Sequence, residues 1–334
     1  MKKSLIFLII GIVIILGVVG YFYFGGGGEE GTVEVEYKGV WMPALGASTL
    51  FPENYFPEDM LPEGYNMSIM EPVFADFDKA EQAGINTFAF QIGYWVDENG
   101  EISILPGTKE FFADFIERAH ARGFKIWLNP EILHRVDSGG PSEMRIIPEE
   151  WIENTDLLEN YELAIIETAK FAEEYDVEIF SPSSEMYVNF DFEKPGREIS
   201  KKLLIDIKPE IDAVYSGKIC LRGEWPNDDF LSYYSCFGVP VNMVKNEEEK
   251  QKLIEHMEFQ MNREEEIELM VGELYEGHDW QSMSPEEKKR GFETSLEIVE
   301  GKVSGIFILD TGRLTQLFPE SFEDTIKEFY EWFG

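Results

Sequence analysis

Short apolar segments alternate with amphipathic helical segments along most of the chain, and this alternation limits the possible fold more than any other feature. Helical segments, with apolar residues at three- and four-residue spacing, separate eight runs that are too short for helices. These runs are the expected strands: Gly39–Leu45, Thr87–Gln91, Lys125–Leu128, Val177–Phe180, Lys218–Leu221, Phe237–Val241, Ile267–Val271 and Gly305–Leu309. Eight strands alternating with about eight helices predict a (β/α)8 barrel, also called a TIM barrel.

Capping and breaking residues mark several helix boundaries. Thr108 is expected to cap a helix that ends at Gly123, because a threonine hydroxyl accepts bonds from the first turn and glycine tolerates left-handed backbone. Ser284–Glu287 (SPEE) fits a capping box with proline at the first helical position. Pro209 has no amide hydrogen and is therefore expected to kink or restart the helical segment around it.

The N-terminal segment is apolar enough to cross a membrane. Leu5–Phe24 is uncharged, and as a helix it would be about 30 Å long, the thickness of a hydrocarbon core. Two lysines precede it and favour a cytoplasmic N-terminus. The sequence thus predicts a transmembrane helix at 1–24, a Gly/Glu linker at 25–37 and a barrel domain at 38–334, membrane-anchored and extracellular. A cleaved signal peptide, which would leave the domain secreted, is the alternative, although no A-x-A site follows the apolar run.

The charge and the cysteine and histidine content restrict the partners. A formal net charge of −37 argues against nucleic acid, which needs clustered Lys and Arg. The acidic surface is explained by solvation or a salty habitat, or it draws a cationic substrate such as an amino-sugar polymer. Four histidines without metal-ligand spacing predict no metal site, and neither a cofactor nor a partner subunit is expected. Cys220 and Cys236 form either one disulfide or two buried thiols.

Two glutamates come after predicted strands at corresponding places in the repeat. Glu185 lies in VEIFSPSSEMY, after the fourth strand, and Glu273 lies in IELMVGELYE, directly after the seventh. The C-terminal ends of barrel strands meet at one mouth, where barrel enzymes carry their chemistry. Cleavage of a glycosidic bond needs two carboxyl groups, of which one donates a proton and the other attacks or activates water. Glu185 and Glu273 are therefore the predicted catalytic pair, with Glu224 and Glu276 as the next candidates.

Acids, amides and aromatic residues gather at the same strand ends. Aromatic faces stack on sugar rings, and acids and amides bond sugar hydroxyls. The predicted substrate-binding residues are Gln91, Tyr94, Trp95, Asn129, Glu131, Tyr187, Glu224, Trp225, Asn242, Tyr275, Trp280 and Asp310. Trp95, Trp225 and Trp280 are expected to be exposed on loops and to include at least one sugar platform.

Three motifs resemble those of the clan A glycoside hydrolases, most closely the β-mannanase type of glycoside hydrolase family 113. They are KIWLNPEI at the third strand, SSEMY at the fourth and GELYEG at the seventh, and the resemblance covers Lys38–Gly334. It implies that Glu185 is the acid/base and Glu273 the nucleophile of a retaining hydrolase. The implied substrate is a β-linked oligo- or polysaccharide, mannan-like as the best guess.

The chain departs from the clan pattern at three places. Ser184 stands where the clan usually has asparagine before the acid/base, Leu309-Asp310 replaces a common tryptophan, and the second strand lacks a basic residue at its end. These departures bear on the substrate more than on the reaction class. They leave open a non-catalytic carbohydrate-binding barrel at the cell surface. A barrel enzyme holding a divalent ion is a separate alternative. The ligands of that ion would be Glu131, Glu185, Glu224 and Asp310.

Overall fold

A closed barrel of eight parallel strands forms the centre of the computed structural model. The structure describes residues 35–42, 77–78, 80–134, 147–148, 151, 155–183, 194–223, 233–262, 267–275 and 284–309. The barrel strands are β1 (Tyr37–Trp41), β2 (Thr87–Val96), β4 (Lys125–His134), β5 (Ile179–Phe180), β6 (Lys218–Arg222), β7 (Cys236–Asn242), β8 (Glu268–Tyr275) and β9 (Gly305–Leu309). Each pairs in parallel with the next, and β1 pairs with both β9 and β2, so the sheet closes. The predicted barrel and its eight strands are confirmed.

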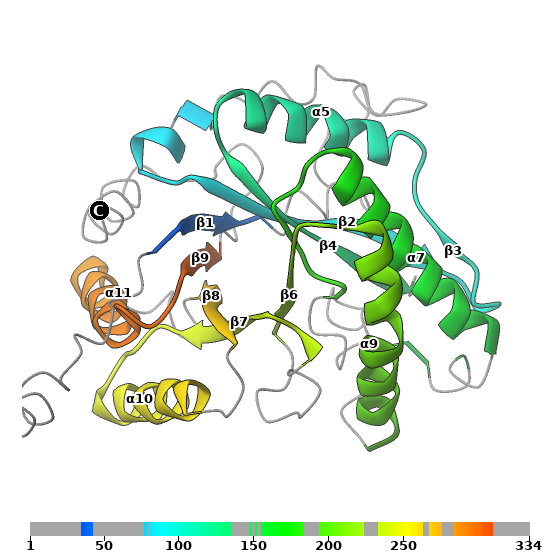
Figure 1. Cartoon of the computed structure of the whole chain (residues 1–334). Coiled ribbons are helices and arrows are strands. Elements are labelled where there is room, and N and C mark those ends of the chain that lie inside the picture. The colour runs from blue at the N-terminus through cyan, green and yellow to red at the C-terminus, as the bar shows by residue number, and fades with distance from the viewer. Residues whose placement is uncertain are drawn as a thin grey trace, which may run out of the picture.

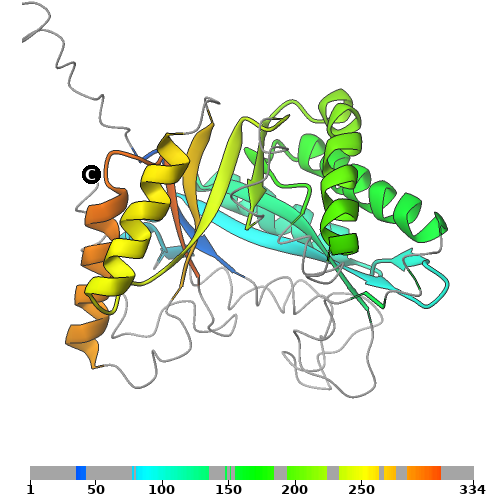
Figure 2. The same ribbon diagram turned by 90° about the horizontal axis from the view of Figure 1, so that it is seen from below.

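Helices cover the outside of the barrel. They are α5 (Thr108–Ala121), α7 (Thr155–Glu174), α9 (Lys194–Val214), α10 (Glu247–Met261) and α11 (Pro285–Val299). Helices α7 and α9 lie side by side on one flank, and α10 and α11 on another (Figures 1 and 2). The spacing of apolar residues in the sequence also predicts helices at 72–83 and 322–333; the first is described only from residue 77, and the second lies outside the described residues.

Two helix signals act differently from the prediction, and a third is confirmed. Gly107, with φ 82°, is the N-cap of α5, and the buried hydroxyl of Thr108 makes no cap bond. Helix α9 continues through Pro209 as one element. Its apolar face is buried on both sides of the proline, by Leu204 and Ile207 before it and Ile211 after it. Burial of this face stabilises a continuous helix by more than the loss of one backbone hydrogen bond at Pro209 destabilises it. The capping box at the start of α11 is formed by Ser284 and Glu287.

Alternation along the strands divides the core into two parts. Residues facing the barrel axis form one cluster, which comprises Tyr37, Trp41, Ala89, Trp127, Ile179, Cys220, Cys236, Met270 and Phe307. Residues of opposite parity pack against the helices, as when Phe90 of β2 stacks on Phe112 of α5 with ring centroids 4.9 Å apart. Successive strand residues point to opposite faces, so parity along each strand tells which side chains reach the barrel interior.

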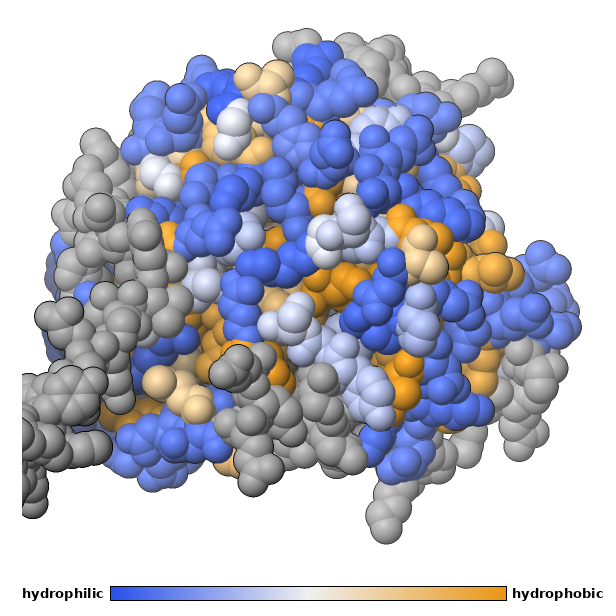
Figure 3. Space-filling view, in the orientation of Figure 1, coloured by the Kyte–Doolittle hydropathy of each residue, from blue (hydrophilic) through white to orange (hydrophobic). Residues whose placement is uncertain are grey.

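The surface and the N-terminal region complete the description. The face seen in Figure 3 is mainly hydrophilic, with hydrophobic residues in narrow areas between. Strand β1 begins at Tyr37, one residue inside the segment 25–37 that was expected to be a linker. The predicted transmembrane segment 1–24 lies outside the described residues. Among the helices that the structure does describe, none is both long and apolar enough to span a bilayer.

Candidate active site

The mouth of the barrel is extended on one side by two long strands. Strands β2 and β4 have ten residues each and remain paired over their whole length. The sequence predicts that these strands end at Gln91 and Leu128, and this is corrected, because the structure extends them to Val96 and His134. Gln91 has the parity of Ala89, and Asn129 and Glu131 have that of Trp127, which places all three side chains on the axis-facing side.

The side chains on this wall are held close together. Gln91 and Asn129 are register partners on neighbouring strands. The Gln91 amide nitrogen donates to the Glu131 carboxylate at 2.7 Å, and Asn129 Nδ2 donates to the Pro130 carbonyl at 3.0 Å. Asn129 is fully buried, and its Oδ1 accepts no bond from any residue of the described chain. The three predicted sugar-binding residues thus form one polar group at the mouth.

A β-bulge in β8 directs Glu273 toward the mouth. The register with β7 runs Val239–Val271 and then Pro240–Glu273, so Gly272 is the extra residue. A Cβ on Gly272 would lie 2.9 Å from Gly238 Cα, and one on Gly238 would lie 2.8 Å from the Trp127 ring. Only glycines allow this close approach. Strand β8 continues to Tyr275, so Glu273 lies within the strand and not, as predicted, just after it.

Arg222, the last residue of β6, binds the candidate nucleophile. One Nη of Arg222 lies 2.7 Å from Glu273 Oε2, and the two side chains are 4% and 17% exposed. The guanidinium carbon lies 3.5 Å from the centre of the Trp41 ring, where its charge meets the negative face of the indole. A nearly buried arginine therefore supplies the charge that favours an ionised Glu273 carboxylate.

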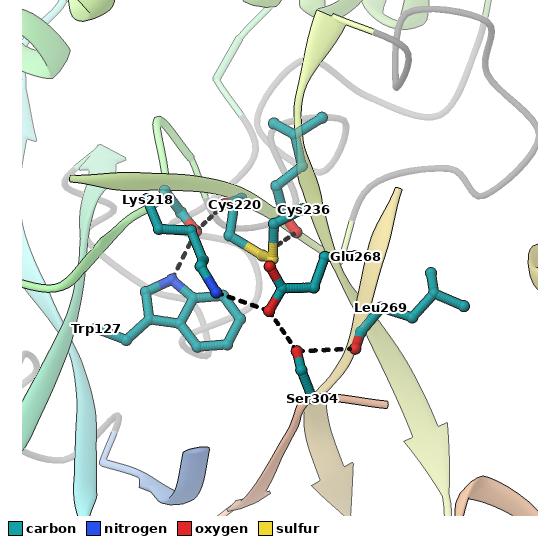
Figure 4. The surroundings of a disulfide bond; sticks show 9 residues. Trp127, Lys218, Cys220, Cys236, Glu268, Leu269 and Ser304 are labelled. Carbon is teal, nitrogen blue, oxygen red and sulfur yellow. Dashed lines mark hydrogen bonds and ion pairs between the residues drawn. A yellow bond between two sulfur atoms is a disulfide. The ribbon is translucent and has the colours of Figure 1, made fainter. Parts of the chain in front are cut away.

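Aromatic rings and a disulfide form the floor beneath this pair. Trp41 and Trp127 meet edge to face with centroids 6.0 Å apart, and Trp127 Nε1 donates to Ser181 Oγ at 2.8 Å. Cys220 and Cys236 are register partners on β6 and β7 and are bonded through their sulfurs, which resolves the two alternatives in favour of a disulfide. Figure 4 shows this bond beside Trp127 and Glu268. Arg222 lies two residues beyond Cys220 on the same face of β6.

Two of the predicted aromatic residues, Tyr94 and Trp95, are not placed as expected. Tyr94 has the parity of Phe90 and points away from the axis; its hydroxyl lies 2.8 Å from Thr168 Oγ1 of α7. Burial raises the pKa of Tyr94 to about 12. Trp95 is only 8% exposed and lies in β2, so the expectation of an exposed loop tryptophan is wrong. Tyr275 pairs in register with Asn242 at the ends of β8 and β7, and Asn242 is exposed.

The remaining predicted site residues lie outside the described residues. They are Glu185, Tyr187, Glu224, Trp225, Trp280 and Asp310. The Glu185 and Glu273 carboxylates are expected to lie about 5–5.5 Å apart, the separation typical of retention, and this stays a prediction. Within the described ranges, no group of three or more His, Cys, Asp or Glu side chains is arranged to hold a metal ion.

Three residues of this site, Arg222, Ser181 and Trp41, are not among those predicted from the sequence. Arg222 was detectable, because Lys218, Cys220 and Arg222 alternate with apolar residues and must share one face of a strand. Its contact with Glu273 joins β6 to β8 across β7 and becomes visible only in the folded barrel.

Together these features define a class of protein: a (β/α)8 barrel with a carboxylate–guanidinium pair and a polar amide group at its mouth. No protein-family model and no curated protein sequence matches the chain. Among solved structures, it is similar to AaManA, a family 113 β-mannanase from Alicyclobacillus acidocaldarius, with TM-score 0.58, 15% identity, and coverage of 79% of this chain and 92% of that chain. It is also similar to PbGH5A, a glycoside hydrolase family 5 enzyme from Prevotella bryantii B14, with TM-score 0.61, 13% identity, and coverage of 90% and 97%.

A further solved structure, described as a family 113 β-1,4-mannanase in complex form, has TM-score 0.59 at 14% identity and covers 78% of this chain and 93% of its own. These likenesses confirm the resemblance to family 113 at the level of the fold. At such low identity they establish the barrel alone.

Proposed function

We propose that the protein is a retaining glycoside hydrolase that acts on a β-linked oligo- or polysaccharide. The observation that carries this proposal is Glu273, which a bulge directs to the barrel mouth and Arg222 holds at 2.7 Å. A carboxylate fixed in this way suits nucleophilic attack. The solved structures of similar fold are described as mannanases and family 5 enzymes, so mannan is the first substrate to test.

In the proposed mechanism, Glu273 attacks the anomeric carbon while Glu185 gives its proton to the departing glycosidic oxygen. This step breaks the glycosidic bond and forms a bond between the sugar and Glu273. Glu185, now ionised, takes a proton from water, whose oxygen attacks the same carbon and releases Glu273. Arg222 stays hydrogen-bonded to a carboxylate oxygen of Glu273 through both steps, and the contact of its guanidinium group with the Trp41 ring limits its movement.

The two glutamates are tested with substitutions in the full chain and oligosaccharides of mannan, glucan, galactan and chitosan. Glu273→Ala should reduce turnover to background, and added azide should restore it as a glycosyl azide of inverted configuration. Glu185→Ala should slow substrates with poor leaving groups far more than activated aryl glycosides, since only the former need the proton. Full activity in either variant would contradict the assignment, and binding without cleavage by the native chain would favour the non-catalytic alternative.

We further propose that the barrel works outside the cytoplasm, anchored by residues 1–24. The apolar run supports the anchor, and the buried Cys220–Cys236 disulfide supports an oxidising compartment, since cytosolic thiols are mostly kept reduced. Cell fractionation tests this: the full chain should sediment with membranes, and a chain lacking residues 1–28 should not. Equal distribution of the two would argue against the anchor.

A further inference from the structure

The axis-facing side of β6 carries three side-chain links, one at every second residue. From the base of the barrel, the end opposite the mouth, these links are Lys218–Glu268, Cys220–Cys236 and Arg222–Glu273. In both ion pairs the nitrogen and oxygen atoms are 2.7 Å apart, and both pairs cross β7 to reach β8. The disulfide lies between them and joins β6 to β7 itself; Figure 4 shows it beside the Lys218–Glu268 pair. Side chains therefore fix β6 at its base, its middle and its end.

The backbone holds the mouth end of β6 mainly from one side. In the described part of the chain, β5 pairs with β6 at Lys218 and Ile219 and no further. From Cys220 to Arg222, the ladder bonds that the described residues form are with β7 alone. Toward β5, the Cys220 carbonyl accepts a hydrogen bond from the Ser181 hydroxyl. Segments with few backbone bonds open most readily, so a further bond between β6 and β7 has its largest effect at this end.

Strand β7 has no side chain where Arg222 crosses it. Gly238 is the register partner of Arg222 and has the axis-facing parity of Cys236. The arginine therefore passes over bare backbone to reach Glu273 on β8, which lies two strand spacings, about 9.6 Å, from β6. Contact with Trp41 holds the guanidinium end, but the direction of this long side chain is set where it leaves β6. A shift of β6 against β7 would carry the Arg222 nitrogen out of the range of about 2.7–3.2 Å in which it donates to a carboxylate.

We propose that Cys220 and Cys236 are positioning residues for the nucleophile. Their bond joins β6 to β7 two residues before Arg222 and so keeps the guanidinium group aimed at Glu273. This inference rests on the proposed glycosidase function, in which Glu273 attacks the sugar. A displacement of about 1 Å at a reacting group can cost about 100-fold in rate. The disulfide therefore contributes to turnover, in addition to its contribution to stability.

The first test compares two variants of the full chain, each of which loses one link of β6. The substrate is p-nitrophenyl β-mannoside, β-glucoside, β-galactoside or β-glucosaminide, whichever the native chain cleaves fastest, because this leaving group needs no proton. The disulfide-free variant, Cys220→Ala with Cys236→Ala, should release nitrophenol in a single turnover about 10-fold more slowly or worse. The matched control is Lys218→Met, which removes the link at the base of β6 and should change this rate by less than about 2-fold. Circular dichroism checks that both variants are folded at the assay temperature.

The second test asks whether the disulfide acts through Arg222. In an Arg222→Met chain, removal of the disulfide should change the single-turnover rate by less than about 2-fold, because the side chain that it positions is absent. A disulfide with a structural role only would slow both chains equally, and that result overturns the inference. If the combined variant does not fold, Arg222→Lys takes the place of Arg222→Met with the same expectation, since lysine cannot reproduce the planar contact with Trp41.

The outcomes separate the inference from the function beneath it. A native single-turnover rate in the disulfide-free variant, or an equal loss in Lys218→Met, overturns the inference and leaves the glycosidase in place. If the native chain cleaves no glycoside, the glycosidase is contradicted, and denaturant unfolding then decides the inference. The coupling between Arg222→Met and Glu273→Gln should fall at least about 2-fold when the disulfide is absent, and an unchanged coupling overturns the inference.

Discussion

At the scale of single residues, Arg222 is the most informative side chain. It is almost fully buried, stacks on Trp41 and binds Glu273, so its removal breaks a nearly buried ion pair. Arg222→Met should destabilise the fold by about 2–3 kcal/mol and lower kcat/KM about 100-fold.

Two further variants separate charge from packing at this position. Arg222→Lys keeps the charge but not the planar stacking, so it should restore kcat/KM only in part. Arg118→Met changes an exposed arginine on α5 and should alter stability by less than about 1 kcal/mol. An unchanged kcat/KM in Arg222→Met would assign Arg222 a structural role only.

Residue-level prediction from the sequence succeeded where parity and chemistry agreed. Gln91, Asn129 and Glu131 were expected at the mouth and lie together there, because each lies at an axis-facing position of β2 or β4, beyond the apolar residues that begin the strand. The prediction that Tyr94 lines the sugar site was wrong, because an aromatic residue near a strand end can pack against helices as readily as it binds a ligand. Its parity along β2 turns its side chain toward α7. Arg222 could have been predicted to face inward, but its partner on β8 could not.

At the scale of elements, the bulge in β8 places Glu273. Gly272→Ala would put a Cβ 2.9 Å from Gly238 Cα. Because the atom it meets belongs to the backbone, strands β7 and β8 would have to shift relative to each other. The variant should lose about 1–3 kcal/mol of stability and at least about 10-fold in kcat/KM, measured by denaturant unfolding and by turnover. Gly123→Ala is the control: it strains a left-handed glycine with no atom near its Cβ, and it should cost stability without changing kcat. Equal kcat for the two variants would show that the bulge does not orient the nucleophile.

The extent of β4 shows why element boundaries were harder to predict than element identity. Pro130 follows the apolar run KIWL and normally marks the end of a central strand. Here the Leu128 carbonyl accepts a hydrogen bond from the Ser181 backbone amide, on the β5 side of β4. Residue 130 has the same parity, so its backbone groups also face the β5 side. Strand β5 has already ended at Phe180 at this level. No ladder bond is lost at Pro130, and pairing with β2 carries the strand to His134. The early end of β5 therefore allows β4 to continue past Pro130. The residues around Pro130 do not show where β5 ends, so this extension could not be predicted from them.

At the scale of the whole molecule, the disulfide joins two adjacent strands of the closed barrel. Replacing Cys220 and Cys236 together by alanine should lower the unfolding free energy by about 3 kcal/mol, the value expected for a loop of this size. Thermal unfolding should show a lower Tm for the double variant, and dithiothreitol added during unfolding should lower the Tm of the native chain only. Equal Tm values would mean that barrel packing alone fixes β6 against β7.

The order of events during biosynthesis follows from where this disulfide lies. Both cysteines are fully buried and face the axis of a barrel that strands close on every side. Thiol–disulfide exchange needs a thiolate to reach a sulfur atom, so neither an oxidant nor a reductant can act on the finished molecule without opening it. The bond must form while β6 and β7 are still accessible, before β8, β9 and β1 complete the circle. Whether a molecule carries the bond is thus decided by the surroundings in which it folds, and later exposure to oxidant or reductant leaves that outcome unchanged.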